Sequence, residues 1–402
     1  MKCEYSILKL KIKKNNQYYD ILNDLTYKAN NLYNHANFII RQNFLNSNRE
    51  KGKFMNSNKL SKMYCKAKNQ GKTEFSKPYY DLPAQTGIQV LNRLEKNWKS
   101  FFALCKNKDL KHRPKPPKYK PKGERYSYSF TNQQVKKNED KIIILPKLLN
   151  IKLDLPSQNL QQIEVKPKHN YLLLNVIYKE VVEDKLPTEA PLKNIMGIDL
   201  GLNNLAAITF SNSEDNYLIN GKGLKSKNIY FNYKIAQLKS ITKKRNNKYT
   251  SNQIKNLYEK RDNCMTDYLH KTSKKIVDLA KEYNIDTVII GHNKEQKKNC
   301  KIKNFVQIPI FKLYQLLEYK LNREGIHLIE VEESYTSGTS YLDNELPIVD
   351  NYRPSRRKQR GLFITNKGIK INADINGSKQ IIKKIKAGNN INLSLNPKLI
   401  VV

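Results

Sequence analysis

Two aspartates that lie far apart in the chain occupy settings suited to metal-dependent chemistry. Asp199 ends the apolar, β-type segment 194–199 and precedes Gly201, which allows a backbone or a phosphate to approach closely. Asp374 lies at a turn that leads into a helix. An aspartate before a glycine is also common in simple turns, so Asp199 alone decides nothing. Together the two acids could share divalent metal ions.

A third carboxylate is needed if two Mg²⁺ ions, about 3.5 to 4 Å apart, are to hold the attacking and leaving oxygens of a phosphodiester. Side chains alternate between the two faces of a strand, so the segment 327–333 places Ile329 and Val331 on the face of Glu333. Glu332 points the other way. If the Ile/Val face packs inward, Glu333 is the third acid. The alternative is an exposed glutamate in an acidic strand end.

Strands and helices alternate around these acids and predict an α/β layer fold. Asp199 and the segment that follows it form two strands, and an irregular insert precedes the last helix. The remaining elements expected in this half are helices at 224–244, 254–283, 310–322 and 373–386, with strands at 286–291 and 327–333.

The first half combines amphipathic helices with short strands. Apolar residues recur every three or four positions over 18–40, and Pro83 opens a second helix with an apolar stripe. A polar, lysine-rich connector is expected between them. Strands are expected at 6–13, 141–145, 151–155, 162–165 and 171–182, which would form a small sheet or barrel.

A basic, proline-rich segment over 106–125 is expected to form an extended strap, because proline prevents a helix there. It could contact a nucleic-acid backbone, or it could be a solvated linker. The aromatic residues Tyr119, Tyr126, Tyr128 and Phe130 could stack on bases. The candidate nucleic-acid-binding residues are Arg113, Lys115, Lys118, Tyr119, Lys120 and Lys122.

The composition favours a polyanionic partner. The 402 residues carry a formal net charge of +38, which attracts nucleic acid over long range. No apolar run approaches the roughly 20 residues that span a bilayer, and the N-terminus lacks a signal-peptide core, so we expect a cytoplasmic, nucleoid-associated protein. The five cysteines contain no CxxC pair, which argues against disulfides and a cysteine-based zinc site.

Four segments, 197–201, 288–294, 333–337 and 372–377, resemble the ordered motifs of TnpB proteins, the RNA-guided DNA endonucleases of bacterial insertion sequences that are related to type V CRISPR effectors. Residues 31–34 and 82–85 resemble the N-terminal helical region of that family. The resemblance implies a RuvC nuclease domain of RNase H-like fold, preceded by a small wedge β-barrel with an inserted helical recognition bundle. It also implies two Mg²⁺ ions, for which Mn²⁺ could substitute, a guide RNA from the element end, and double-stranded target DNA carrying a short adjacent motif.

The domain boundaries follow from this resemblance. They are 1–14 and 106–187 for the wedge barrel, 15–105 for the recognition domain, 188–333 and 366–386 for the nuclease domain, 334–365 for the insert and 387–402 for a disordered tail.

The sequence departs from the family pattern at two places. The usual second acid would end the strand that here ends in Gly291, and the rearranged site of some relatives supports Glu333 in its place. Glu295 lies in a lysine-rich loop and is the weaker alternative. Where the family often has two CxxC pairs, this chain has residues 337–340 and 360–363 without cysteine, so the insert must fold without zinc.

Three functions remain open. The first is an active RNA-guided, Mg²⁺-dependent DNA endonuclease that uses Asp199, Glu333 and Asp374. The second is a nuclease-dead RNA-guided repressor, which keeps the basic surfaces and needs no metal. The third is a transposase that acts without RNA. The three acids favour the enzyme, whereas Gly291 keeps the repressor in play. The sequence leaves the oligomeric state, the guide and the cleavage pattern open.

Overall fold

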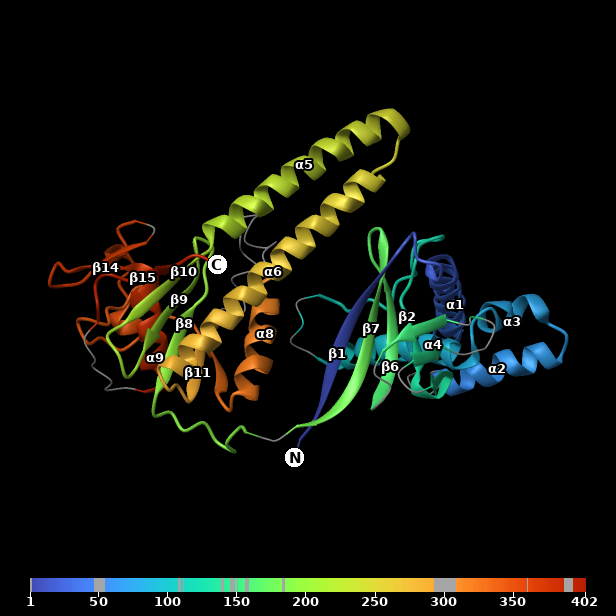
Figure 1. Cartoon of the computed structure of the whole chain (residues 1–402), viewed down its shortest axis with the longest axis horizontal. Coiled ribbons are helices and arrows are strands. Elements are labelled where there is room, and N and C mark those ends of the chain that lie inside the picture. The colour runs from blue at the N-terminus through green and yellow to red at the C-terminus, as the bar shows by residue number, and fades with distance from the viewer. Residues whose placement is uncertain are drawn as a thin grey trace. The chain divides into compact units, whose positions relative to one another are not determined.

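The computed structural model describes residues 2–402 except 47–54, 108–109, 111, 139–140, 145–148, 150, 156–158, 183–184, 293–308, 360 and 387–392. The chain forms two compact units, Met1–Val182 and Glu183–Val402 (Figure 1). Among the described residues, no helix is long and apolar enough to cross a membrane.

A six-stranded mixed sheet forms the centre of the C-terminal unit (Figure 1). Strand β11 runs parallel to both β8 and β12, whereas β9 is antiparallel to β8 and β10. The carboxyl ends of β8, β11 and β12 therefore meet at one edge of the sheet. In sheet order, the strands are β12 (His327–Glu332), β11 (Thr287–His292), β8 (Ile195–Asp199), β9 (Asn204–Phe210), β10 (Asn216–Asn220) and β15 (Lys398–Ile400).

Helices cover both faces of this sheet, because alternate side chains of the buried strands point to opposite sides. Met196 and Ile198 pack in one core with residues of α6 (Asn252–Glu282) and α8 (Ile310–Arg323). Ile195 and Ile289 pack on the other side with residues of α9 (Ala373–Ile385). This arrangement confirms the predicted α/β class.

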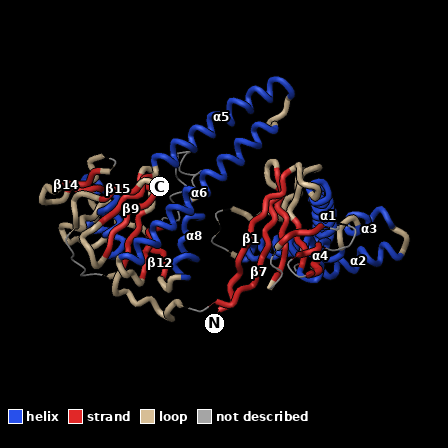
Figure 2. Tube along the Cα trace, viewed as in Figure 1, coloured by secondary structure: helices blue, strands red, loops and turns tan. Residues whose placement is uncertain are grey.

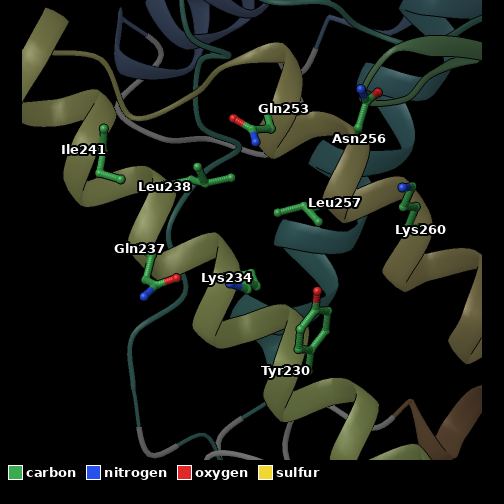
Figure 3. Close-up of a pocket in the computed structure, with 9 residues that line it drawn as sticks. All are labelled: Tyr230, Lys234, Gln237, Leu238, Ile241, Gln253, Asn256, Leu257 and Lys260. Carbon is green, nitrogen blue, oxygen red and sulfur yellow. The ribbon is translucent and has the colours of Figure 1, made fainter.

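Helix α5 (Lys222–Asn246) pairs with α6 in a long hairpin. Its inner end packs through Leu224 into the core of the sheet. Farther out, the two helices lie side by side and enclose a groove between them (Figure 3). Sequence periodicity had predicted both helices to within a few residues.

The prediction of a disordered tail over 387–402 is wrong for the part that the structure describes. Residues 398–400 form β15, which pairs in parallel with the edge strand β10, and Leu393 is buried in a core with Phe363. An edge strand offers unpaired backbone groups that a short apolar segment can satisfy. A strand of three residues is too short for periodicity to reveal. Residues 387–392 lie outside the described part of the chain.

The N-terminal unit contains two antiparallel sheets (Figure 2). The larger has the order β1 (Lys2–Lys13), β7 (Tyr171–Val182), β6 (Leu160–Pro167) and β2 (Tyr128–Thr131). The smaller contains β3 (Val135–Asn138), β4 (Lys141–Ile144) and β5 (Ile151–Asp154). The described strands thus form two sheets of four and three strands, and closure into a barrel stays a prediction.

The described part of this unit contains four helices, of which two were predicted; α1 and α4 pack against the strands, and the other two pack against these helices. Helices α1 (Tyr19–Asn46) and α4 (Ala84–Lys106) match the expected amphipathic segments. The segment expected to be a polar connector instead contains α2 (Ser57–Asn69) and α3 (Thr73–Tyr80). Helix α2 buries Leu60, Tyr64 and Ala67, and the Asn56 side chain accepts a hydrogen bond from the Lys59 amide at 2.9 Å. The many lysines around these apolar residues masked the helical pattern.

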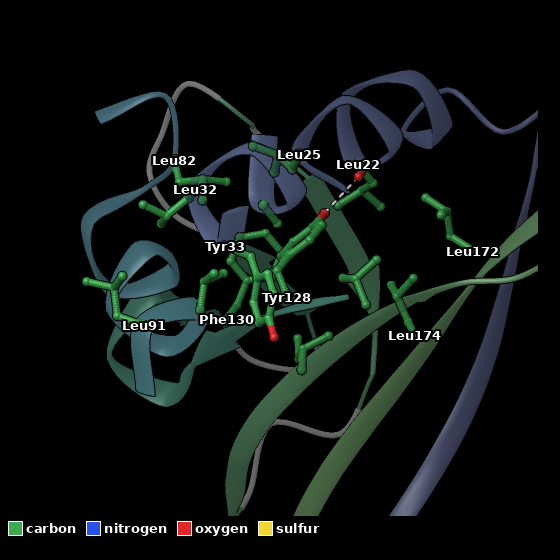
Figure 4. Packing of buried hydrophobic residues seen from close by; sticks show 14 of the residues in the cluster. Leu22, Leu25, Leu32, Tyr33, Leu82, Leu91, Tyr128, Phe130, Leu172 and Leu174 are labelled. Atoms are coloured by element: carbon green, nitrogen blue, oxygen red, sulfur yellow. Dashed lines mark hydrogen bonds between the residues drawn. The ribbon is translucent and has the colours of Figure 1, made fainter. Parts of the chain in front are cut away.

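Aromatic and leucine side chains build the core of the N-terminal unit (Figure 4). Tyr128 and Phe130 lie in this core, only 1% and 0% exposed, and the Tyr128 hydroxyl donates to the Leu22 carbonyl at 3.0 Å. The expectation that these two rings stack on bases is therefore wrong. Alternation along β2 turns both of them inward, against α1 and α4.

Candidate active site

Asp199 lies at the end of β8, on the floor of a cavity of about 910 Å³. Glu333 and Asp374 line the same cavity, so the structure brings together all three acids that the sequence singled out. Asp199 keeps some exposed surface, and its carboxylate lies against Gly377 of α9. A Cβ atom at Gly377 of α9 would lie 2.8 Å from Asp199 Oδ2, so only glycine lets the helix approach this closely.

Glu333 reaches the cavity across Gly291. Strand β11 separates the Asp199 strand from β12, and Gly291 pairs in register with Val331. A Cβ atom at Gly291 would lie 2.6 Å from Glu333 Cγ and 2.7 Å from Glu333 Oε1. The Glu333 side chain, together with Ile381 Cδ1 of α9 at 2.6 Å, therefore fills the space that a side chain on β11 would occupy.

The phase of β12 agrees with the sequence analysis. Val331 packs on the α9 side of the sheet with Ile195 and Ile381, whereas Leu328 packs on the opposite side. Glu333, two residues after Val331, is thus directed to the α9 side. Glu332 is exposed and points away from this face. Glu295 lies outside the described residues.

Asp374 is fixed in the first turn of α9. The Asn372 side chain caps the helix and accepts hydrogen bonds from the amides of Asp374 at 2.9 Å and Ile375 at 3.3 Å. The Asp374 carboxylate accepts one bond from Asn204 Nδ2 at 2.8 Å and one from Arg357 Nη2 at 3.2 Å. A negative charge is favourable at a helix N-terminus.

The electrostatics of the cavity disfavour charged acids. Burial, with additional repulsion from Glu333 and Asp374, raises the pKa of Asp199 well above its usual value, and Arg357 opposes this shift. Burial likewise raises the pKa of Glu333 to about 7, against the opposing effect of Lys384. Two neighbouring carboxyl groups are thus held where ionisation is costly unless a cation is nearby.

This donor chemistry fits a hard divalent cation. Mg²⁺ prefers carboxylate and other oxygen ligands, and its charge would offset the repulsion that raises the pKa of Asp199. Within the described part of the chain, no three His, Cys, Asp or Glu residues already form a group able to hold a metal ion. Ion binding therefore requires the side chains to adjust, and Arg357 would have to share or release Asp374.

Two polar residues of the site were missed by the sequence analysis. Asn204 opens β9 directly after the Asp199 turn, and Arg357 comes from the irregular insert. Asn204 lies at the start of the second predicted strand of the pair and carries no distinctive pattern. Arg357 is one of many basic residues in the chain, so composition could not select it.

The insert at 334–365 is organised by Arg356, whose side chain is only 10% exposed. Its guanidinium donates to Glu345 Oε2 at 2.6 Å and Oε1 at 2.9 Å, and it lies 3.6 Å from Asp343. It also donates to the carbonyls of Gly338 at 3.1 Å and Asn351 at 3.2 Å. The insert contains no cysteine, and this ion-pair cluster connects the segments that surround it.

The basic strap is extended and is fastened along α1. Asn34 and Asn37 donate to strap carbonyls at Lys120 and Pro117, at 2.9 and 3.1 Å. Arg41 lies over the Tyr119 ring, with its Cζ atom 4.8 Å from the ring centroid. Tyr119 remains 45% exposed. The strap is thus not a free linker, because its backbone is held while Arg113, Lys115, Lys118 and Lys122 stay exposed. Lys120 instead turns inward, with its Nζ atom 5.4 Å from the Tyr33 ring centroid.

Two family models match the C-terminal half of the chain. One, OrfB_IS605, is described as a probable transposase and matches residues 175–297. The other is described as the Cas12f1-like TNB domain and matches residues 311–381. Together the two matched ranges include Asp199, Glu333 and Asp374.

Curated relatives agree with these matches. The chain is 26% identical over 204 residues to the TnpB-like protein ORF457 of Acidianus two-tailed virus, covering 47% of this chain and 41% of that protein. It is 29% identical over 241 residues to the CRISPR-associated endodeoxyribonuclease Cas12f2 of a Micrarchaeota archaeon, covering 54% of this chain and 40% of that protein. The chain is similar to TnpB-like and Cas12f proteins over about half of its length. It spans about two-fifths of the length of each of these two relatives.

Among solved structures, the chain matches the protein of a Cas12f1–sgRNA–target DNA complex with a TM-score of 0.37 and 19% identity, covering 94% of this chain and 98% of that one. A chain from a CRISPR–Cas12f ternary complex gives a TM-score of 0.38 and 17% identity, with 90% and 80% coverage.

Proposed function

We propose that the protein is an RNA-guided, Mg²⁺-dependent DNA endonuclease encoded by a transposable element. The observation that carries this proposal is the convergence of Asp199, Glu333 and Asp374 on one cavity, with Glu333 extending over Gly291. The relationship to an endodeoxyribonuclease and to a TnpB-like protein supports the same reaction class. The C-terminal unit is then a RuvC-type nuclease domain, and the N-terminal unit contains the wedge and the recognition helices.

Each acid has a distinct part in this proposal. Asp199 on the rigid sheet and Asp374 at the start of α9 would hold the ions from two sides, and Glu333 would supply the carboxylate that β11 lacks. Bound Mg²⁺, or Mn²⁺ in its place, would activate a water and stabilise the leaving oxygen of the phosphodiester. Asn204 positions the Asp374 carboxylate, and Arg357 limits the repulsion among the acids.

The partners follow from the resemblance to TnpB and from the charge. A guide RNA from the element end would select double-stranded DNA beside a short adjacent motif. The net charge of +38 and the fastened strap supply a surface for nucleic-acid phosphates. Nothing in the proposal requires zinc, because Arg356 connects the insert.

The experiment uses the protein co-expressed with RNA transcribed from the element end. The Asp199→Ala and Asp374→Ala variants should abolish guided cleavage of plasmid DNA in Mg²⁺, because each loses a carboxylate that would hold an ion. Both should keep DNA binding in gel-shift assays and should lose Mn²⁺ affinity in titration calorimetry. Cleavage near the wild-type rate by either variant contradicts the proposal.

A wild-type protein that binds guided DNA tightly but never cuts it in Mg²⁺ or Mn²⁺ would instead be the nuclease-dead repressor. A protein that purifies without RNA and cuts unguided DNA would be the conventional transposase.

Replacing Lys115, Lys118 and Lys122 of the strap with glutamine should reduce the slope of log affinity against log salt by about 2 to 3 if each neutralises one phosphate. An unchanged slope returns the strap to a structural role.

A further inference from the structure

The outer part of the α5–α6 hairpin is not used by the proposed nuclease site, and its burial pattern is unusual. Helix α5 buries only Leu224, Asn228 and Ile235. No residue between 236 and 253 is buried. In proteins, most of the stability of a helix comes from packing of its apolar face. The outer hairpin is therefore a long element whose packing surface within its own unit is limited to the contact between the two helices.

A groove of about 430 Å³ lies between the helices in this region (Figure 3). Leu238, Ile241 and Leu257 form its apolar part, and Tyr230, Lys234 and Lys260 lie around them. We call these six residues the hairpin groove. Figure 3 shows Leu238 and Leu257 extending into the space between the two helices. The groove combines an apolar floor with cationic edges.

The α5 arm of the hairpin and the turn that follows it carry charge of one sign, whereas Glu259 and Asp262 flank Lys260 on α6. The segment 222–258 contains no aspartate or glutamate. Its basic residues are Lys222, Lys225, Lys227, Lys234, Lys239, Lys243, Lys244, Arg245, Lys248 and Lys255. A segment with this many like charges and no acid attracts a polyanion and repels a second copy of itself.

Exposed aromatic rings accompany this charge. Tyr230, Tyr233 and Tyr249 are 55%, 59% and 59% exposed, and Ile241 is 46% exposed. Tyr230 and Tyr233 lie three positions apart on α5 and therefore share one face. Large exposed aromatic and apolar side chains mark interaction surfaces. Positive charge combined with exposed rings is the pattern that binds unpaired nucleotides, because bases stack on the rings while lysines hold the phosphates.

We propose that the hairpin groove and its flanking Tyr233 bind a single nucleic-acid strand, with Lys234 and Lys260 on its phosphates and Tyr230 or Tyr233 against a base. This inference rests on the proposed function in that it takes nucleic acid as the partner, and it assigns one surface to that partner. An acidic protein segment would satisfy the lysines but would leave the exposed rings unexplained. RNA and displaced DNA share the required chemistry.

The test measures the binding of fluorescein-labelled 12-nucleotide oligouridine and oligothymidine by anisotropy, as a function of KCl, with full-length protein stripped of nucleic acid. EDTA is present, so cleavage cannot contribute. The Lys234→Gln/Lys260→Gln variant should reduce the salt slope by about 1.4, since each single-strand phosphate contact contributes about 0.7. The Tyr230→Ala/Tyr233→Ala variant should weaken binding at least about fivefold at every salt concentration, with the slope unchanged.

A matched control removes two lysines from the same hairpin away from the groove. Lys271 and Lys274 of α6 pair with Asp267 and Asp278 at 3.0 and 2.6 Å. The Lys271→Gln/Lys274→Gln variant should leave slope and affinity near wild type. Equal losses in the control and the groove variant, or no loss in either groove variant, overturn the inference.

The stronger of the two oligonucleotide responses identifies RNA or DNA as the occupant. Groove variants with wild-type oligonucleotide binding but an altered sedimentation coefficient would reassign the surface to protein association and overturn the inference. Failure of the nuclease proposal appears separately, as the absence of guided cleavage. If the wild type does not cut DNA but the groove substitutions weaken oligonucleotide binding, the inference that the hairpin groove binds a nucleic-acid strand is still supported.

Discussion

Arg356 and Arg357 are adjacent in the chain, yet they contact two different groups of acids, and only Arg356 pairs with every acid of its group. Arg356 is 10% exposed and closes an ion-pair cluster with Glu345 and Asp343, at 2.6 and 3.6 Å. Arg357 is 37% exposed and contacts only one carboxylate of its group, Asp374, at 3.2 Å. We call Glu345 and Asp343 with Arg356 the closed acid cluster of the insert. We call Asp199, Glu333 and Asp374 with Arg357 the open acid cluster of the cavity.

The two clusters differ in how their charge is balanced. In the closed cluster, hydrogen bonds from Arg356 and the Ser340 amide lower the pKa of Glu345 against the effect of burial. In the open cluster, burial and mutual repulsion raise the pKa of Asp199 well above its usual value. Acids that are fully paired stabilise a fold, whereas buried acids that lack a cation are suited to bind one. The comparison therefore separates structural from functional acids without reference to the family.

The largest expected effect comes from adding an acid to the open cluster. A glutamate at residue 291 would compete with Glu333 for the same space, because a Cβ there lies 2.6 Å from Glu333 Cγ, and it would also press on Ile381 Cδ1 at 2.6 Å. The Gly291→Glu variant should lose at least about 10²-fold in guided cleavage, the scale for disturbing one preorganised group. The double variant Gly291→Glu/Glu333→Gly should recover part of this loss. Equal activity of the single and double variants would contradict the shared-space account.

The next effect is on stability and compares the two arginines directly. Arg356→Leu leaves two largely buried acids without a cation and should lower the free energy of unfolding by about 3 to 5 kcal/mol. Arg357→Leu removes a partly exposed pair and should change it by no more than about 1 kcal/mol. Urea unfolding monitored by circular dichroism measures both. Similar losses for the two variants would remove the distinction between closed and open clusters.

A smaller effect of opposite sign is expected within the open cluster. Asp199→Asn removes a carboxylate that its neighbours repel. The free energy of unfolding of the metal-free variant should therefore be about 1 kcal/mol higher than that of the wild type. Glu345→Gln in the closed cluster should be destabilising under the same conditions. Both variants change a carboxylate to an amide of the same shape, so the signs can be compared. A destabilising Asp199→Asn would mean that its charge is already balanced.

The last expected effect is a pH dependence of stability. Because the pKa of Glu333 is raised from 4.5 to about 7, the folded chain retains a proton in this range that the unfolded chain releases. The free energy of unfolding in EDTA should therefore contain a component that decreases as the pH rises from about 4.5 to 7. Glu333→Gln should remove this component. Identical pH profiles for the variant and the wild type would contradict the raised pKa.

The parts of the fold with regular periodicity could be predicted from the sequence. Strand alternation placed Glu333 and Val331 on one face, and the structure packs Val331 against α9. Arg357 could not be found in this way, because it belongs to an irregular segment in which spacing carries no information. Asn204 begins β9, but an asparagine at the start of a strand carries no distinctive pattern. The inward turn of Tyr128 was missed because the adjacent basic strap suggested a nucleic-acid surface, whereas tertiary packing decides which side of a short strand is buried.

The central claim, that Glu333 takes the place of an acid absent from β11, is tested most directly by single-turnover cleavage of guided DNA in Mg²⁺. The panel contains the wild type, Glu333→Gln, Glu332→Gln and Glu295→Gln, each purified with the same guide RNA. The account predicts a loss of at least about 10²-fold for Glu333→Gln and near wild-type rates for the other two. A fully active Glu333→Gln, or an inactive Glu295→Gln beside it, would contradict the claim.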